Sequence, residues 1–264
     1  MLIAQNCAKR ELIYIMYSNE REKEIMALLE QNTYATVEYL SKAIHISPSS
    51  IRRDLARLEM KGMITRSYGG AEIKESLNKQ IPFFLRSHKN TEEKLNVASK
   101  ASSLVHPGDV IFLDSSTSTY FMIGFLKNIK DLTVITNSLA GMSLCSEYGI
   151  NSYFAGGHLN SENRSCCVGT HTEEFIRSFH ADCCFFSVQS LTRDGVLYDC
   201  FANEIQPRRL MIQNSEKKVF LCDNSKINHY SAYKLCKIEL LTHVISDIDI
   251  GNYLEREYAN IKFL

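Results

Sequence analysis

Five consecutive hydroxyl-bearing residues, Ser115 to Thr119, follow a short apolar run that ends in Asp114. A helical pattern begins among them, so the hydroxyl groups lie between a predicted strand and the first turn of a predicted helix. At such a position, free backbone N–H groups and hydroxyl donors bind anions, phosphate groups among them. Taken alone, the run is equally compatible with an ordinary helix cap. The residues concerned are Asp114, Ser115, Ser116, Thr117, Ser118 and Thr119.

A second polar sequence of the same kind strengthens this prediction. Thr136, Asn137 and Ser138 end the next predicted strand and open the next predicted helix. Ligands of open parallel sheets bind at the carboxyl ends of the strands, so two such loops on neighbouring strands can hold one ligand. We therefore predict a site for a phosphorylated small molecule at this edge of the sheet.

A basic helix is predicted within the first seventy residues. Ser47 is a good N-cap, and Pro48 fits the first helical position, where a missing N–H costs nothing. From there to about Lys61, apolar side chains recur on one stripe, while short polar groups and arginines occupy the opposite face. Such a helix can enter the major groove of DNA, where hydroxyls bind phosphates and arginines read guanine edges or neutralise the backbone. The stripe is Ile51, Leu55 and Leu58, and the predicted DNA contacts are Ser47, Ser49, Ser50, Arg52, Arg53 and Arg57.

The surrounding elements complete a known DNA-binding architecture. Helices are predicted over Arg21–Glu30 and Val37–Ile44, and a strand at 63–66 with a tight turn at 67–70 follows the third helix. Three short helices and a small hairpin describe a winged helix-turn-helix. Two further side chains of the predicted wing, Arg66 and Tyr68, would reach the DNA backbone or the minor groove. We expect a double-stranded DNA operator as the partner.

The charge of the whole chain at first argues against nucleic acid. Thirty Lys and Arg balance thirty Asp and Glu, whereas nucleic-acid-binding proteins usually carry a basic excess. Residues 42–74, however, hold seven basic and three acidic side chains, a net charge of +4, and residues 1–41 hold four and six, a net charge of −2. Judged by charge alone, residues 42–74 could instead contain a helix whose basic face is simply exposed to solvent and binds no DNA. The cap, the turn and the wing together favour a DNA-reading helix.

The remainder of the chain alternates strands and helices, which predicts a layered α/β domain with a mainly parallel sheet. The expected organisation is an N-terminal extension (1–20), a winged helix-turn-helix (21–75), a linker (76–90) and an α/β domain for ligand sensing and oligomerisation (91–264). Strands are expected at 110–114, 132–136, 151–155, 183–188, 217–222 and 243–246, and helices at 91–104, 118–127, 138–147, 170–179 and 203–213.

Several classes of protein are excluded by what the sequence lacks. Neither a G-x-G-x-x-G nor a Walker A sequence occurs, so we expect no nucleotide cofactor. The nine cysteines form no C-x-x-C pair and no Cys/His set with zinc spacing, which favours free thiols in a reducing compartment and no metal. No apolar run approaches the roughly 20 residues that cross a bilayer, and the first residues do not follow the order of a signal peptide. We expect a cytoplasmic protein.

Two stretches resemble a known family. Ser50-Ile51-Arg52-Arg53-Asp54-Leu55 and the sequence from Leu58 to Ala71 resemble the helix-turn-helix and wing of the DeoR family of bacterial transcriptional regulators. The segments around Asp114–Ser118, Val134–Ser138 and Asp223–Lys226 resemble the sensor domain of the same family, whose Rossmann-like fold is related to ribose-phosphate isomerase. The resemblance spans about residues 21–250. It implies that the hydroxyl-rich loops bind a phosphate while Asp114, Glu204 and Lys226 face a sugar.

The sequence departs from the family at a few positions. Threonine is usual where Ser50 stands, and about twenty additional residues precede Arg21. The family commonly has glycine where Ser116 and Ser190 stand. Because glycine lets the backbone approach a ligand closely, two serines there imply a narrower pocket, another effector, or a pocket that binds no sugar phosphate.

We therefore predict a DNA-binding transcriptional regulator, a repressor of carbohydrate-metabolism genes whose C-terminal domain senses a phosphorylated sugar or related metabolite, and no enzyme. Helix-turn-helix proteins usually bind two operator half-sites with two recognition helices, which predicts a homodimer or homotetramer. Two alternatives are kept. One is a sugar-phosphate isomerase or transferase, since a carboxylate and a lysine beside a phosphate loop can transfer protons. The other is a regulator whose sensor pocket no longer binds a sugar phosphate.

Overall fold

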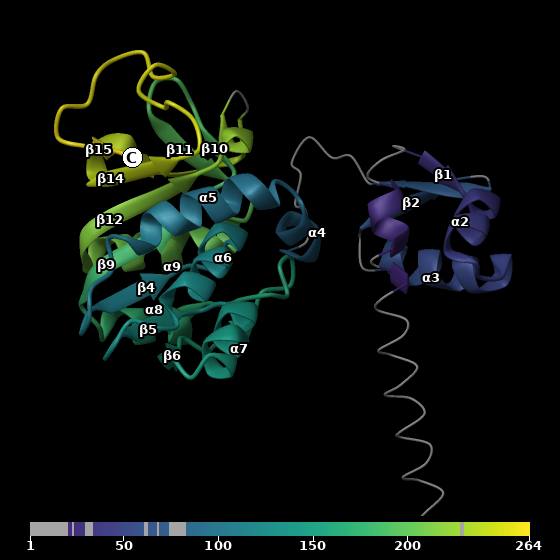
Figure 1. The fold of residues 1–264 in the computed structure, drawn as a ribbon, viewed down its shortest axis with the longest axis horizontal. Helices are drawn as coiled ribbons and strands as arrows, with labels where there is room; N and C mark the ends of the chain where they lie inside the picture. The colour runs from purple at the N-terminus through teal and green to yellow at the C-terminus, as the bar shows by residue number, and fades with distance from the viewer. Residues whose placement is uncertain are drawn as a thin grey trace, which may run out of the picture. The chain divides into compact units, whose positions relative to one another are not determined.

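The computed structural model describes residues 21–22, 24–29, 34–60, 63–67, 69–73, 83–227 and 230–264. The chain divides into two compact units, residues 1–77 and residues 78–264, each with its own core (Figure 1). Three sequence-based expectations lie outside the described residues: the N-terminal extension, the contact by Tyr68, and residues 76–82 of the linker.

Unit 1 combines helices with a small antiparallel sheet. Residues 21–22 and 24–29 are helical, and α2 (Val37–Ile44) and α3 (Pro48–Met60) follow. The sheet has the order β1-β3-β2, in which β2 and β3 form the hairpin of the predicted wing. Its strands are β1 (Tyr34–Thr36), β2 (Ile64–Ser67) and β3 (Gly70–Ile73). The winged helix-turn-helix prediction is confirmed, and β1 is an additional strand that the sequence analysis did not anticipate.

Local chemistry explains where the helices of unit 1 begin and end. The Thr36 hydroxyl accepts a hydrogen bond from the backbone N–H of Tyr39 at 3.0 Å and so caps α2. His45 ends the same helix with a left-handed backbone, φ 59°. The predicted cap of α3 is present, since the Ser47 hydroxyl accepts the Ser50 N–H at 3.3 Å. The predicted stripe is also confirmed: Ile51, Leu55 and Leu58 are buried.

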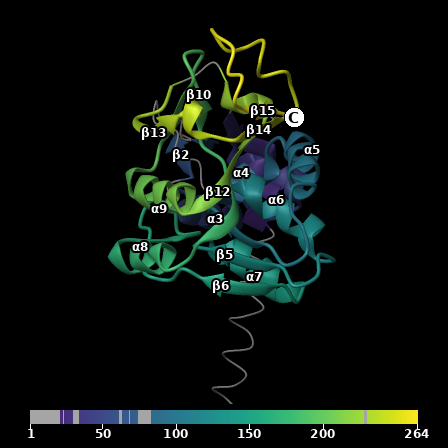
Figure 2. The same ribbon diagram turned by 90° about the vertical axis from the view of Figure 1, so that its left-hand side faces the viewer.

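Unit 2 is built on a seven-stranded parallel sheet with helices on both faces (Figures 1 and 2). The strand order is β15-β14-β12-β9-β4-β5-β6, and all of its pairings are parallel. The fold-class prediction is therefore confirmed. The strands are β4 (Val110–Leu113), β5 (Thr133–Thr136), β6 (Asn151–Phe154), β9 (Ala181–Phe186), β12 (Ser215–Cys222), β14 (His243–Ser246) and β15 (Lys262–Phe263).

The two faces of the sheet support two separate cores. Side chains alternate along each strand, so Phe112 of β4 faces one core while its neighbours Ile111 and Leu113 face the other. One core packs under α8 and α9, and the other under α5, α6 and α7 (Figure 2). Burial on both faces explains why the central strand β4, with the sequence Val-Ile-Phe-Leu, is wholly apolar. The helices are α5 (Thr91–Ser102), α6 (Thr117–Leu126), α7 (Leu139–Glu147), α8 (Thr170–Arg177) and α9 (Ala202–Gln213).

Smaller elements complete unit 2. An antiparallel sheet of order β10-β11-β13 and a two-stranded hairpin, β7-β8, add to the predicted α/β pattern. β7, β8 and β10 have only two residues each, which explains why the sequence did not indicate them. The strands are β7 (His158–Leu159), β8 (Cys167–Val168), β10 (Ser190–Leu191), β11 (Val196–Asp199) and β13 (Tyr233–Lys237).

One helix lies inside the segment expected to be a linker. α4 (Phe83–His88) is the first described element of unit 2. It packs beside α6, where the rings of Phe83 and Tyr120 meet edge to face with centroids 5.6 Å apart. Asn90, with φ 52°, then reverses the chain into α5. The described end of the expected linker is therefore a packed helix.

Candidate functional site

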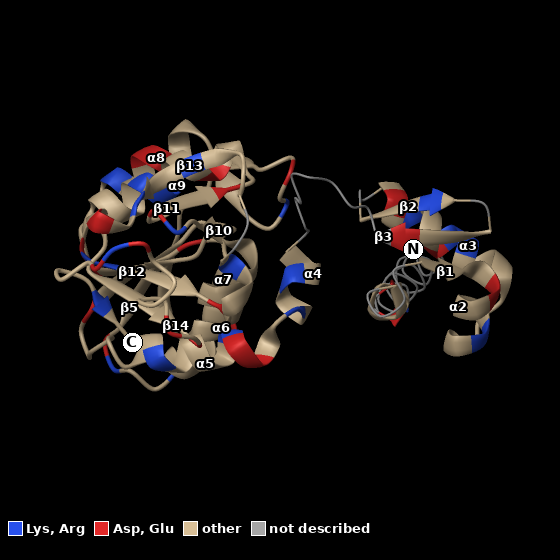
Figure 3. Ribbon diagram, turned by 90° about the horizontal axis from the view of Figure 1, so that it is seen from above, with Lys and Arg blue, Asp and Glu red and all other residues tan. Residues whose placement is uncertain are grey.

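The outer face of α3 carries most of the predicted DNA contacts. Ser47, Ser49, Arg52 and Arg53 are exposed, and Ser50 is half-buried. Their side chains already interact locally: the Ser47 and Ser49 hydroxyls are 3.0 Å apart, and Arg53 Nη2 donates to Ser50 Oγ at 3.3 Å. Basic residues are seen on both α3 and β2 in Figure 3. The structure thus brings hydroxyls and two guanidinium groups to one exposed helix face.

Arg57, another predicted contact, turns toward the interior of unit 1. Its Nε lies 3.0 Å from Glu22 Oε1, and its Nη2 binds Asp54. Asp54 is only 1% exposed and also binds Arg21, whose Nε lies 3.2 Å away. A buried carboxylate needs such partners, because an isolated buried charge is costly. Arg57 therefore ties α3 to the first helix, a structural role that the sequence analysis did not anticipate.

The wing residue Arg66 is anchored to α3. Its Nε lies 2.6 Å from Glu59 Oε2, and its backbone N–H donates to Glu59 Oε1 at 3.2 Å. These hydrogen bonds from Arg66 lower the pKa of Glu59. Nearly half of the Arg66 side chain is exposed. The ion pair fixes the wing against the end of α3 while leaving the guanidinium within reach of solvent.

In unit 2, the hydroxyl run joins β4 to α6, as predicted, and all five of its residues are buried. The Ser116 hydroxyl caps α6 by accepting the Thr119 N–H at 3.3 Å. Asp114 Oδ1 accepts the Ser116 N–H and the Thr119 hydroxyl, each at 3.0 Å. The first-turn amides of Thr117 and Ser118 have no helical carbonyl within reach, since the first four N–H groups of any helix lack one. The run is thus both a helix cap and a source of donors.

A buried arginine gathers the carboxylates of this site. Arg208 of α9 lies 2.8 Å from Asp114, 2.9 Å from Asp199 and 3.3 Å from Glu204. All four side chains are at least 90% buried. Burial opposes the charge of Arg208, but Asp199, Asp114 and Glu204 raise its pKa overall. Asp114 and Glu204, which the family resemblance placed around a sugar, are therefore brought together by one guanidinium.

Glu204 is further held by the β7-β8 hairpin and by the hydroxyl run. Its Oε1 accepts from Asn163 at 2.6 Å and from Asn160 at 3.3 Å, and its Oε2 accepts from the Ser115 hydroxyl at 3.0 Å. Burial raises the pKa of this carboxyl, while Arg208 opposes the increase. Cys166 Sγ lies 3.5 Å from the same carboxylate. Glu204 therefore connects α9, the hairpin and the start of α6.

The second polar loop lies on the adjacent strand, as predicted. β5 pairs with β4, and the Ser138 hydroxyl caps α7 by accepting the Gly141 N–H at 3.1 Å, while Ser138 N–H donates to Thr136 Oγ1 at 3.1 Å. Asn137 Nδ2 donates to Cys167 O at 2.8 Å. Its Oδ1 is buried and accepts no hydrogen bond from the described residues. A buried acceptor without a donor is unusual in a native protein and suits a ligand hydroxyl or water.

Two lysines interact beside the carboxyl end of β12. Lys226 Nζ is 3.8 Å from Asp223 Oδ2, an atom that is buried and makes no hydrogen bond with the described residues. Lys94 of α5 is 3% exposed. Burial, followed by the charge of Lys226, lowers the pKa of Lys94 to about 8, and Asp223 partly offsets the decrease. Lys94, Lys226 and Asp223 thus act on one another electrostatically at the carboxyl edge of β12.

Sequence reasoning missed several members of this site. Arg208 and Lys94 resemble ordinary helical cations in the sequence. Asp199 ends β11, and Asn160 and Asn163 lie in the loop between β7 and β8, three strands that were not predicted. The distances that unite them join residues far apart along the chain, such as the 94 residues between Asp114 and Arg208. A signal was present only for Arg208, since an arginine four residues after Glu204 on a helix favours an ion pair.

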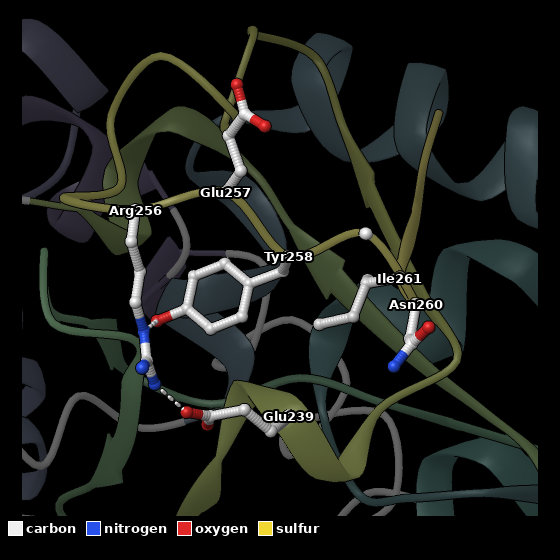
Figure 4. A pocket seen from close by; sticks show the side chains of 7 residues that line it. Glu239, Arg256, Glu257, Tyr258, Asn260 and Ile261 are labelled. Atoms are coloured by element: carbon white, nitrogen blue, oxygen red, sulfur yellow. Dashed lines mark hydrogen bonds and ion pairs between the residues drawn. The ribbon is translucent and has the colours of Figure 1, made fainter.

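A separate pocket of about 280 Å³ lies beside the segment that leads into β15, at the amino end of the sheet (Figure 4). Its polar groups already engage one another: Arg256 binds Glu239, and its Cζ lies 5.0 Å from the centre of the Tyr258 ring. This pocket therefore lies apart from the residues gathered at the carboxyl edge. Its lining is Glu239, Arg256, Glu257, Tyr258, Ala259, Asn260 and Ile261.

Two general properties of the described residues bear on function. Their eight cysteines are free thiols, and no group of three or more His, Cys, Asp or Glu is arranged to hold a metal ion. Within the same residues, no helix has the length and apolar character needed to cross a membrane.

A winged helix-turn-helix followed by a parallel α/β unit defines the class, a DNA-binding regulator with a sensor domain. Two family models match the chain: the DeoR-like helix-turn-helix domain over residues 21–77 and the DeoR C-terminal sensor domain over residues 89–248. The chain belongs to the DeoR family of transcriptional regulators.

Known proteins with similar sequences are regulators of this kind. The HTH-type transcriptional regulator GolR of Listeria innocua is 32% identical over 246 residues, which cover 93% of this chain and 96% of that protein. The glycerol-3-phosphate regulon repressor of Escherichia coli is 28% identical, with 88% and 92% covered. Among solved structures, ribose 5-phosphate isomerase A from Methanocaldococcus jannaschii is similar with a TM-score of 0.41 and 20% identity. That similarity covers 53% of this chain and 56% of the isomerase.

Proposed function

We propose that the protein represses carbohydrate-metabolism genes by binding an operator through α3 and the wing, and that a phosphorylated sugar or related metabolite bound to unit 2 controls this binding. The observation that carries the DNA-binding part is the two-sided character of α3. Ile51, Leu55 and Leu58 are buried on one side, whereas Arg52 and Arg53 are exposed on the other. An exposed arginine on a recognition helix can form a bidentate contact with guanine.

The DNA-binding proposal is tested with single substitutions. Arg52→Ala or Arg53→Ala is expected to weaken operator binding by about 1–3 kcal/mol if the arginine reads a base. The folding of unit 1 is expected to change little, because both side chains are exposed. Affinity is measured by gel shift at several salt concentrations with the operator found by genome-wide binding-site mapping. A loss confined to the cognate sequence indicates base reading, and a uniform loss with a smaller salt slope indicates a phosphate contact.

A matched control separates position from charge. Lys127→Ala removes one positive charge from an exposed residue at the end of α6 in unit 2. Its affinity for the operator is expected to equal that of the unmodified protein. If Lys127→Ala weakens binding as much as Arg52→Ala and Arg53→Ala do, the assignment of the α3 face is wrong.

The effector proposal rests on the chemistry gathered at the carboxyl edge of the sheet. The amides at the start of α6, together with Lys94 and Lys226, supply donors and positive charge for a phosphate. The buried acceptors Asn137 Oδ1 and Asp223 Oδ2 suit the hydroxyl groups of a sugar. The named role of one relative, repression of a glycerol-3-phosphate regulon, supports an effector that combines phosphate and hydroxyl groups.

Calorimetric titration and thermal unfolding with a panel of sugar phosphates test this part. We expect binding and stabilisation by at least one phosphorylated sugar and none by its unphosphorylated counterpart. Failure of every sugar phosphate to bind would favour a sensor domain that has lost its effector. Turnover of ribose 5-phosphate by the purified protein would favour an isomerase instead.

The oligomeric part of the proposal follows from how helix-turn-helix proteins read DNA. Paired half-sites one helical turn apart need two recognition helices, so we propose a homodimer or homotetramer. Sedimentation of the full chain at micromolar concentration measures the mass directly. A monomer that remains monomeric on operator DNA would contradict this part.

A further inference from the structure

Lys94 connects α4 to the candidate effector site. It lies in the first turn of α5, directly after the corner formed by Lys89 and Asn90. Its ammonium group reaches back across this corner and donates to the backbone carbonyls of Arg86 and Lys89. Carbonyls at the end of a helix have no intrahelical donor, and a lysine there both bonds to them and interacts favourably with the helix dipole. Lys94 thus caps the carboxyl end of α4.

The same ammonium group lies where an effector anion is expected. The charged groups that act on it are the cations Lys226 and Arg86 and the carboxylates of Asp223 and Glu93. Together with Lys94 itself, the cluster holds three positive and two negative charges. α4 also lies against the start of α6: Phe83 meets Tyr120, which immediately follows the hydroxyl run. Arg86 of α4 extends over the ring of Phe201, with its Cζ 5.8 Å from the ring centre, and acts electrostatically on Glu204. Both α4 and its cap therefore border the effector site.

We infer that Lys94 is a shared ligand, which caps α4 in the absence of effector and moves to the effector phosphate when that group binds beside the start of α6. This inference rests on the proposed function, since it requires a phosphate at that place. One ammonium group has three donors, and an incoming dianion competes with the two carbonyls because its full negative charge attracts the ammonium more strongly than a carbonyl dipole does. The carboxyl end of α4 then loses its cap.

The position of α4 gives this exchange a regulatory meaning. α4 is the described element of unit 2 that lies nearest in sequence to unit 1. It has only six residues, so loss of its cap affects most of its length. A ligand can control DNA binding only through differential interaction with two states of the protein. Capped and uncapped α4 are two such states, and the phosphate favours the second.

Hydrogen–deuterium exchange of the full chain tests the exchange of ligands, with inorganic phosphate as the probe and chloride at matched ionic strength as the reference. We expect phosphate to slow amide exchange in residues 115–120 and to accelerate it about tenfold in residues 83–90, which corresponds to the loss of one charge-assisted hydrogen bond. In Lys94→Met, residues 83–90 are expected to exchange at the faster rate without phosphate and to show no further response to it.

Lys100→Met is the matched control. Lys100 is on the same helix and its Nζ also donates to a backbone carbonyl, that of Ser246, at 2.8 Å, but it does not reach α4. This variant is expected to respond to phosphate as the unmodified protein does. The phosphate comparison on the unmodified chain remains decisive if Lys94→Met does not fold.

The possible outcomes separate the two proposals. Protection of residues 115–120 without acceleration in residues 83–90 would overturn the shared role of Lys94 and leave the phosphate site intact. No response in either segment would overturn the phosphate site, and the shared role with it. Slow exchange of residues 83–90 in Lys94→Met would show that the lysine does not cap α4.

Discussion

Arg208 Nε donates to Asp114 Oδ2 at 2.8 Å, which joins helix α9 to the carboxyl end of the central strand β4. The same guanidinium binds Asp199 and Glu204, so one positive charge compensates three buried carboxylates. Its planar set of five donors suits this task, which a lysine could not perform. The candidate effector site is therefore organised around a side chain that is itself inaccessible to solvent.

Removal of this guanidinium is expected to destabilise unit 2 strongly. Arg208→Met keeps an unbranched side chain but leaves Asp114, Asp199 and Glu204 without their shared partner. Breaking a buried ion pair in this way costs about 3–5 kcal/mol. Urea unfolding monitored by circular dichroism measures the free energy of unfolding.

Arg209→Met is the control for this substitution. Among the described residues, the neighbouring arginine donates to the backbone carbonyls of Leu235 and Lys234, at 3.0 Å and 2.6 Å. It pairs with no buried carboxylate in the part of the chain that the structure describes, so a loss of about 1 kcal/mol is expected. Equal losses for the two variants would contradict the special role of Arg208.

Gly70 is predicted to be irreplaceable at the junction of the wing and β1. A Cβ added there would overlap the carbonyl oxygen of Ala35 and the ring of Tyr34. Gly70→Ala must therefore displace backbone, and we expect a loss of about 1–3 kcal/mol in the stability of unit 1. DNA affinity should fall with it, because β3 and β2 form the wing.

The adjacent glycine provides the comparison for Gly70→Ala. Gly69 has φ 83° and open space around the position of a Cβ. Asparagine tolerates this left-handed backbone better than most residues, so Gly69→Asn is expected to cost less than Gly70→Ala. Thermal unfolding measures the loss of stability in both variants. An equal or larger loss of stability for Gly69→Asn would refute steric overlap as the cause of the Gly70→Ala effect.

The main α/β framework was predictable because each signal is local. Apolar runs such as that of β4, ended by Asp114 and followed by hydroxyl residues, identify a buried strand and the cap of the next helix without knowledge of the rest of the chain. β10 and β7 have two residues each and carry no such pattern. Their existence depends on pairing partners that only the folded chain provides.

The side-chain partnerships of the sites were less predictable. Arg57 turns inward because it pairs with Asp54. Asp54 is an acidic residue that is buried on the core side of α3, where the other buried side chains are apolar. From spacing alone, Arg57 belongs to the same polar face as Arg53. Similarly, the hydroxyl run identified the start of α6, but its connection to Arg208 requires the sheet and α9 to be assembled first.

The shifted pKa of Lys94 predicts a distinct pH dependence of stability. Burial lowers this pKa to about 8 from an ordinary value of 10.5. Between these values the unfolded chain holds a proton that the folded protein has released, so the free energy of unfolding rises with pH. Relative to Lys94→Met, the unmodified protein is expected to gain about 2 kcal/mol between pH 7.5 and pH 9.5.

Urea unfolding at a series of pH values measures this difference, with Lys100→Met as the matched variant. The difference between the unmodified protein and Lys100→Met should vary less with pH than the difference from Lys94→Met. A constant difference between the unmodified protein and Lys94→Met across this range would contradict the lowered pKa.

Ser116 is predicted to restrict phosphate binding at the start of α6. Its hydroxyl occupies the Thr119 N–H, a donor that glycine at this position would leave free for a ligand. Ser116→Gly is expected to tighten binding of inorganic phosphate about tenfold, the value of one hydrogen bond to a charged group. The cost in stability is only a few tenths of a kcal/mol, because glycine is itself a tolerable N-cap. Calorimetric titration measures the affinity.

Thr36→Gly is the control for this substitution. It removes a comparable cap from α2 in unit 1 and should leave phosphate binding unchanged. Unchanged affinity in Ser116→Gly would mean that the Thr119 amide does not face the ligand.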